Sequence, residues 1–312
     1  MHAMRALDLA LSKKGAHGLP LMGSGDWNDG MNRVGIKGKG ESVWLGMFLC
    51  LVLQRFADIC LEDGTERDYY RKEADTLLET VRTQFENDRY LRGYFDNGAP
   101  LGSGNNTECR IDLLPQAFAA FLLPKDPKSR IAMESAYKEL FDSDTRILKL
   151  FTPPFDIGEG DPGYIKGYLP GIRENGGQYT HGAMWGAMAF FALNMNNEGY
   201  AVLCGSNPAA RTLIPSLAGI YRLEPYALAG DIYAGEHAGR GGWSQYTGAA
   251  GWFFTAVLKG MLGYRCQNGK ITLCPHLPDS LPTVELKYDN GTKVICHSLC
   301  AQKDNKRKID FL

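Results

Sequence analysis

The sequence predicts a mainly α-helical protein with helices in two layers and a small antiparallel β region near its C-terminal end. Residues 43–62 are apolar nearly all round, which is typical of a helix that is buried on most sides. Residues 65–87 carry apolar side chains at helical spacing with charged side chains between them, which is typical of a helix with one exposed face. After residue 263, short runs of β-forming residues alternate with turn signals.

The first of these segments is expected to be an inner helix, and Gly64 supplies its stop signal. The contrast between the two segments returns further along the chain. Residues 127–141 are amphipathic, whereas 182–193 and 249–262 are apolar. Because buried and half-buried helices alternate, we expect an inner and an outer helical layer. The outer helix over 65–87 should bury the following side chains: Tyr70, Ala74, Leu77, Leu78, Val81 and Phe85.

Long glycine-rich and aromatic-rich segments separate the helices. Loops of more than ~15 residues within a compact domain are usually functional. The segments of this kind are 15–41, 92–112, 152–179 and 222–247.

The β-type runs KITLCP, TVELKY and TKVICHSL are separated by Pro-Asp and Asp-Asn-Gly turn signals. We therefore expect a small antiparallel sheet over residues 264–300 and a boundary between a helical region, 1–263, and a C-terminal β region with its tail, 264–312. Residues 302–308 are rich in basic side chains and are expected to be a solvated end.

The overall composition excludes several classes of protein. The 312 residues include 34 Lys plus Arg and 35 Asp plus Glu, a net charge of -1, which argues against a basic nucleic-acid-binding surface. No apolar run approaches the ~18 residues of a membrane span. Residues 1–12 lack the pattern of a secretory signal, so a cytoplasmic location is expected.

The eight cysteines are scattered and are expected to be free thiols. One local group could suggest zinc, but it lacks the paired short spacings of zinc modules, so no metal is expected. Its members are Cys274, His276, Cys296, His297 and Cys300.

The first candidate site segment is the glycine-bracketed loop 23–32, GSGDWNDGMN, with two carboxylates and a tryptophan. A carboxylic acid beside an apolar ring tends to have a raised pKa, as a general acid requires. The alternative is an Asx-rich turn without catalytic function.

The second segment, 167–185, carries Arg173, Glu174, Gln178 and His181 just before an apolar helix. Free N–H groups and the positive end of the helix dipole suit such a helix start to an anion. The alternative is that His181 only caps or packs.

The third segment, 224–252, places Thr247 and Gly248 at another helix start, with Trp243 and Tyr246 just before it. The alternative is that the small residues only let helices approach and the tryptophans only fill the core. The three segments together predict a site for sugar and phosphate chemistry.

At these residues the sequence resembles glycoside hydrolase family 94, the inverting phosphorylases of disaccharides and oligosaccharides. It is most similar to the C-terminal phosphorylase-like region of cyclic β-1,2-glucan synthases and to 1,2-β-oligoglucan phosphorylases. The resemblance covers roughly residues 14–290. The motifs that carry it are GAHGLPLMGSGDWNDGMNRVG (15–35), KGKGESVWLGMFL (37–49), DPGYIKGYLPGIRENGGQYTHGAMW (161–185), EPYALAGDIY (224–233) and GRGGWSQYTGAAGW (239–252).

The resemblance implies the C-terminal part of an (α/α)6 barrel and assigns roles to individual residues. Asp29 is implied as the general acid, with Asp26 and Trp27 shaping the subsite of the donor sugar. Phosphate is the implied co-substrate, with no cofactor. The residues implied or expected to bind phosphate are His181, Thr247 and Gly248, and those for sugar are Arg173, Glu174, Gln178, Trp243 and Tyr246.

The expected activity is inverting phosphorolysis of a β-linked glucan, with β-1,2 favoured, or the reverse synthesis, through α-glucose 1-phosphate. Two alternatives stay open: an inverting β-glucosidase with Glu174 or Glu236 as base, and a noncatalytic carbohydrate-binding fragment. Family members carry a β-sandwich, a linker and early barrel helices before the Asp-Trp-Asn-Asp motif. We therefore expect this chain to be the C-terminal part of a longer enzyme, associating with itself or with the missing N-terminal region. For that parent enzyme, a location at the inner membrane stays open.

Overall fold

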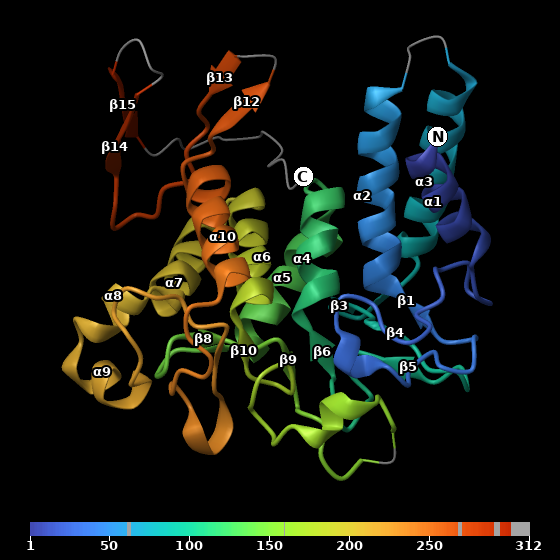
Figure 1. Cartoon of the computed structure of the whole chain (residues 1–312), viewed down its shortest axis with the longest axis horizontal. Helices are drawn as coiled ribbons and strands as arrows, with labels where there is room; N and C mark the ends of the chain where they lie inside the picture. Colours follow the sequence, from blue (N-terminus) through green and yellow to red (C-terminus); the bar gives the residue numbers. More distant parts are fainter. Residues whose placement is uncertain (61–63, 159, 268–269, 290–293, 301–312) are drawn as a thin grey trace.

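Four helices stand side by side and begin at the same end of the molecule, at the bottom of Figure 1. They are α2 (Val43–Ile59), α4 (Leu113–Leu122), α6 (Thr180–Ala192) and α10 (Thr247–Thr255), which continues into the π-helical turn η4 (Ala256–Met261). The computed structural model describes residues 1–60, 64–158, 160–267, 270–289 and 294–300.

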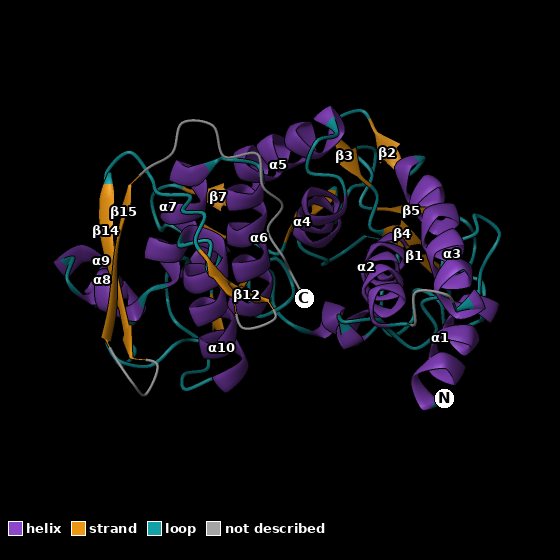
Figure 2. Ribbon diagram, turned by 90° about the horizontal axis from the view of Figure 1, so that it is seen from above, coloured by secondary structure: helices purple, strands orange, loops and turns teal. Residues whose placement is uncertain are grey.

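A second layer of helices covers the first. Helix α3 (Thr65–Arg82) packs on α2, α5 (Pro127–Leu140) on α4, and α7 (Asn196–Ser206) on α6. Seen from above, the described helices form an open arc and not a closed ring (Figure 2). The predicted mainly α-helical, two-layered fold is confirmed. Three further helices lie at the edges: α1 (His2–Ser12), α8 (Pro208–Thr212) and α9 (Pro215–Tyr221).

The helix expected over 65–87 ends at Arg82, and Phe85 lies instead in strand β2 (Phe85–Glu86), which pairs with β3 (Arg89–Tyr90). Helix α4 is an inner helix that the sequence analysis did not assign. All ten of its residues are buried, so it has no polar face to reveal a helical period.

Helix α10 is less enclosed than the apolar pattern of 249–262 predicts, and Phe254 is 65% exposed. The reason is its place at the end of the arc, where α6 covers one side of it.

Short antiparallel strand pairs fix the starts of the inner helices. Strands β1 (Glu41–Ser42), β6 (Ile111–Asp112) and β10 (Gln178–Tyr179) each end where an inner helix begins. They pair with β4 (Gly93–Tyr94), β9 (Phe151–Thr152) and β11 (Asp231–Ile232), and β4 also pairs with β5 (Pro100–Leu101). The other short elements are β7 (Phe141–Asp142), β8 (Ile147–Leu148), η1 (Asp29–Met31), η2 (Tyr164–Gly167) and η3 (Gly235–His237).

The C-terminal region is β-structured, as predicted, but its described residues form two separate two-stranded sheets in place of one. Strand β12 (Arg265–Gln267) pairs with β13 (Lys270–Thr272), and β14 (Thr283–Asp289) with β15 (Val294–Cys300). The basic tail at 302–308 lies outside the described residues.

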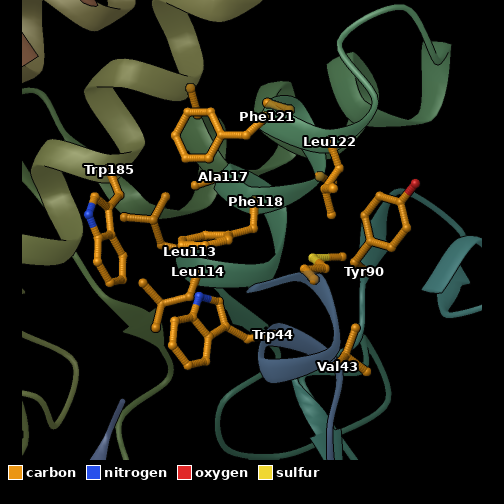
Figure 3. Close-up of a cluster of buried hydrophobic side chains, with 14 of the residues drawn as sticks. Val43, Trp44, Tyr90, Leu113, Leu114, Ala117, Phe118, Phe121, Leu122 and Trp185 are labelled. Carbon is orange, nitrogen blue, oxygen red and sulfur yellow. The ribbon is translucent and has the colours of Figure 1, made fainter. Parts of the chain in front are cut away.

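The core between the inner helices is aromatic (Figure 3). Phe118 of α4 is fully buried, with its ring centroid 5.4 Å from that of Trp44 and 5.1 Å from that of Trp185. Gly186 lets α6 pack closely against Leu148, because a Cβ there would lie 2.7 Å from Leu148 Cδ2.

In the part of the chain that is described, no helix is both long and apolar enough to cross a bilayer.

Candidate active site

The loop 23–32 is anchored by Asp26, whose side chain is fully buried. Its two carboxylate oxygens accept hydrogen bonds of 2.6 Å each from Arg92, and Oδ2 accepts another of 2.7 Å from the Ser42 hydroxyl. Oδ1 also accepts from the backbone N–H of Asn28 at 3.0 Å. Asp26 therefore holds the loop in place, and its carboxylate lines neither the cavity of Asp29 nor the cavity at the start of α10.

Asp29 begins the 3₁₀ turn η1 and is exposed. It lines a cavity of about 180 Å³ together with Trp27, Glu174, Tyr179 and His181. Carboxylates from two loops far apart in the sequence thus meet there, and Trp27 forms part of the wall.

Gly25 explains why a glycine precedes this turn. It has a φ of +121°, and a Cβ there would lie 3.1 Å from Asp29 Cα. A side chain at this position would be strained and crowded against the acid.

Tyr164 of η2 also reaches Asp29. Desolvation raises the pKa of Tyr164 to about 12, and the neighbouring Asp29 carboxylate adds to the shift. The phenol therefore stays protonated beside this carboxylate. The sequence analysis did not select Tyr164.

Asn175 shapes the second loop. Its buried amide donates to the carbonyls of Phe155 (2.8 Å) and Tyr168 (2.7 Å) and accepts from the N–H of Phe155 (2.8 Å). This network presents the neighbouring Glu174 to the cavity. Burial raises the pKa of Glu174 above its usual value, and the nearby charge of Asp29 acts in the same direction.

Arg173 stands beside the cavity and does not line it. Its guanidinium carbon lies 5.0 Å from the ring centroid of Tyr168 and 4.8 Å from that of Trp243, so the cation contacts two aromatic rings. Its Nε is 3.6 Å from Glu174 Oε2. Trp243 is 56% exposed and presents a stacking surface to solvent.

Gln178 is not brought to the site. It is fully buried, its Oε1 accepts from the N–H of Leu148 at 2.8 Å, and its Nε2 donates to the Ser206 hydroxyl at 3.2 Å. Both ends of the amide are used inside the fold, which corrects the expectation that it contacts sugar.

His181 lies in the first turn of α6 and is enclosed by indole rings. Its centroid is 4.3 Å from that of Trp185 and 5.3 Å from those of Trp27 and Trp252, and it stacks on Trp252 at 20°. Burial lowers the pKa of His181 to about 4, so the imidazole is neutral at pH 7. Its Nε2 is buried without a hydrogen-bond partner among the described residues.

A second cavity, of about 360 Å³, lies at the start of α10. Tyr179 and His181 line both cavities, so the cavity that contains Asp29 adjoins the cavity at the start of α10. Tyr179 was not selected from the sequence, although it stands in the quoted Gln-Tyr-Thr-His motif. The residues lining the second cavity are Tyr179, His181, Gly230, Gln245, Tyr246, Thr247, Gly248 and Ala249.

Asp231 is another site residue that the sequence analysis missed. It is buried, and its Oδ1 accepts from the N–H of Trp243 at 3.0 Å. Burial raises its pKa, opposed by this hydrogen bond and by the charge of Arg173. It stands in the quoted motif EPYALAGDIY, and it joins the third segment to the second because β11 pairs with β10, where Asp231 lies opposite Tyr179. The sequence analysis did not reveal this long-range pairing.

The described members of the possible zinc group do not form a metal site. Over the described residues, no three His, Cys, Asp or Glu side chains gather as metal ligands, and the side chain of Cys296 is not described. The seven described cysteines are free thiols.

Similarity to known proteins shows the family of the chain. Residues 1–263 match the family model of the glycosyl hydrolase 94 superfamily, catalytic domain. The chain belongs to this family. The family's catalytic domain is of the (α/α)6 barrel type, and the open arc of paired helices is part of such a barrel.

Among relatives of this glycosyl hydrolase 94 chain, cyclic beta-(1,2)-glucan synthase NdvB of Rhizobium meliloti (strain 1021) is 43% identical over 312 residues, covering 98% of this chain and 11% of that protein. Solabiose phosphorylase of Paenibacillus borealis is 30% identical over 294 residues, covering 92% and 38%. N,N'-diacetylchitobiose phosphorylase of Vibrio proteolyticus is 26% identical over 294 residues, covering 91% and 36%. The chain thus spans between about a tenth and two fifths of the length of these relatives.

Proposed function

We propose that this region catalyses inverting phosphorolysis of a β-linked glucan, or the reverse synthesis, with α-glucose 1-phosphate as the sugar phosphate. One observation carries the proposal: the cavity of Asp29 and the cavity at Thr247 and Gly248 share the side chains of Tyr179 and His181. An acid and an anion site then act on one glycosidic bond. The relatives named as phosphorylases support the reaction type.

In the proposed reaction, Asp29 gives its proton to the glycosidic oxygen as the bond from that oxygen to the anomeric carbon breaks. A phosphate oxygen forms the new bond to the anomeric carbon from the opposite face, which inverts the configuration. Phosphate is already a nucleophile, so no second carboxylate is needed to activate it, in contrast to hydrolysis by water.

Phosphate would be held by the first turns of α6 and α10. The N–H groups of Thr247 and Gly248 are free of intrahelical partners at a helix start, where the dipole favours an anion. A neutral His181 would donate one ring N–H to it. Its low pKa means that it contributes a hydrogen bond and not a positive charge at pH 7.

The glucan side of the site would be formed by Trp27 and Glu174, which line the cavity of Asp29, and by Trp243. The cation–π contact with Arg173 would fix the position of the Trp243 ring. We favour a β-1,2 linkage, supported by the relative named as a β-(1,2)-glucan synthase. We also propose that residues 1–263 are the catalytic region and 264–312 an appended β region. Because the chain spans a minor part of its relatives, we propose that further residues of a longer polypeptide, or a second copy, complete the working enzyme.

An inverting β-glucosidase is the second candidate, favoured by Glu174, which faces the same cavity as Asp29. The other proposed base, Glu236, lies in η3 and lines neither cavity.

One experiment separates the candidates. The native full-length protein is incubated with β-1,2-, β-1,3- and β-1,4-glucooligosaccharides, with and without phosphate, and glucose 1-phosphate and glucose are measured. Glucose 1-phosphate formed only with phosphate supports the proposal. Phosphate-independent release of glucose supports the glucosidase, and binding of oligosaccharide without turnover supports a noncatalytic carbohydrate-binding region.

A further inference from the structure

A buried ionic cluster lies behind the loop that carries Asp29. The side chains of Arg92 and Asp26 are fully buried, and that of Asp112 is 1% exposed. Arg92 donates two hydrogen bonds of 2.6 Å to the two oxygens of Asp26, in the fork geometry that fixes a carboxylate in both position and orientation. Its Nε lies 3.2 Å from Asp112 Oδ2.

The partners of Arg92 are the caps of two inner helices. Ser42 caps α2 by accepting from the N–H of Leu45 at 2.9 Å, and its hydroxyl oxygen also accepts from Arg92 Nη1 at 3.1 Å. Asp112 caps α4 by accepting from the N–H of Leu114 at 2.8 Å. One guanidinium therefore joins the acid loop to the starts of α2 and α4.

The backbone of Arg92 is fixed as well. Its N–H donates to the carbonyl of Leu101 at 2.7 Å, and its carbonyl accepts from the N–H of Val43 at 3.1 Å. The guanidinium thus projects from a rigid position between the strands β3 and β4, at the start of α2. The loop is held against this fixed point, three residues before Asp29.

Stability alone does not explain such a cluster. The free energy lost by removing the charges from water is about as large as the attraction within a buried ion pair. Well-packed apolar residues at such positions often stabilise a fold equally well. Here the cluster carries two carboxylates for one guanidinium, and burial raises the pKa of Asp112 to about 6. The charged arrangement instead fixes the orientation of the Asp26 carboxylate, because a bidentate pair allows that carboxylate little rotation.

We propose that Arg92 is a positioning residue for the general acid, holding Asp29 at the glycosidic oxygen through Asp26. Arg92 contacts neither cavity and acts only through the loop. The inference rests on the proposed role of Asp29, which phosphorolysis and hydrolysis share.

The test compares two donors in the native full-length protein. A β-1,2-glucooligosaccharide needs a proton on its leaving oxygen, whereas 2,4-dinitrophenyl β-glucoside does not, because dinitrophenolate departs with its electron pair unaided. A misplaced acid therefore slows the first donor selectively, whereas general damage to the fold slows both. Asp29→Asn gives the reference pattern for a missing acid.

The variants are Arg92→Lys, which keeps the charge and loses the fork, and Asp26→Asn, which is nearly isosteric. We expect each to lower the ratio of kcat on the glucan to kcat on the aryl glucoside by ~10-fold or more, since small misplacements of a reacting group can cost ~100-fold. The KM for phosphate should stay close to that of the wild type.

Arg89→Lys is the matched control. Arg89 is also largely buried and ion-paired, 2.7 Å from Asp88 and 2.6 Å from Glu139, but it does not contact the acid loop. Its substitution should leave the donor ratio unchanged. An unchanged ratio in Arg92→Lys and Asp26→Asn, with kcat on both donors either equally lowered or unaffected, would overturn the proposal. If Arg92→Lys does not fold, Asp26→Asn alone decides.

Hydrogen–deuterium exchange separates this inference from the proposed function. If the wild type turns over no glucan, the proposed function fails, but faster exchange over residues 23–32 in Arg92→Lys or Asp26→Asn, and not in Arg89→Lys, still supports positioning of the loop. Unchanged exchange there would overturn it.

Discussion

The neutral state of His181 leads to a prediction that can be worked through quantitatively. Burial among three indole rings lowers its pKa from 6.5 to about 4. Above pH 6.5 the imidazole is neutral in both the folded and the unfolded chain. Between pH 6.5 and 4 only the unfolded chain takes up the proton, so the stability that neutral His181 contributes is lost as the pH falls through this window.

A pKa difference of this size corresponds to a loss of about 3 kcal/mol in the free energy of unfolding. The assay is urea unfolding, followed by tryptophan fluorescence from pH 7.5 to 4, of the wild type and of His181→Gln. The variant cannot bind the proton, so the difference between the two chains isolates the linkage. We expect the wild type to lose stability relative to His181→Gln as the pH falls.

His276 supplies a matched control. Burial, aided by Arg265, also lowers its pKa to about 4, but it lies in the C-terminal region, away from both cavities. The difference in stability between the wild type and His276→Gln should show a similar pH dependence, and this variant should bind phosphate as the wild type does. In contrast, His181→Gln should raise the KM for phosphate more than that for glucan. An NMR titration in which the His181 ring protonates near pH 6.5, or a stability difference that does not change with pH, would refute the reasoning.

Three further predictions follow from the fold and the site. Asp29→Asn should lower kcat on glucan by ~100-fold to 10,000-fold with an unchanged circular dichroism spectrum, and near-normal turnover would exclude Asp29 as the acid. Phe118→Ala should lower the free energy of unfolding by ~3–5 kcal/mol, because it opens a cavity between Trp44 and Trp185, and a loss below ~1 kcal/mol in urea titrations would show that the core collapses around it. Ser42→Ala should cost ~1 kcal/mol through loss of the α2 cap, measured in the same titrations, and should also reduce activity because Asp26 loses a partner; full activity would contradict that link.

The sequence by itself determined the helices that carry a clear apolar pattern. The helices at 43–59, 127–140 and 180–192 match the predicted segments 43–62, 127–141 and 182–193, because a long apolar run or an amphipathic period acts within a few residues. The antiparallel pairing of strands 283–289 and 294–300 agrees with the two β-type runs predicted there. The motif loops also gave residues that the structure brings together, namely Trp27, Asp29, Glu174 and His181.

Only the tertiary structure decided which partner each buried polar group has. Asp26 and Gln178 lie in the same motifs as the cavity residues, yet Asp26 pairs with Arg92, 66 positions away, and Gln178 bonds to Leu148 and Ser206 inside the fold. Helix α4 gave no helical period because it is enclosed on every side. His181 is neutral because Trp27, Trp185 and Trp252, from three segments, close around it. Sequence spacing encodes local period and caps, whereas desolvation and long-range pairing depend on what the folded chain brings to each side chain.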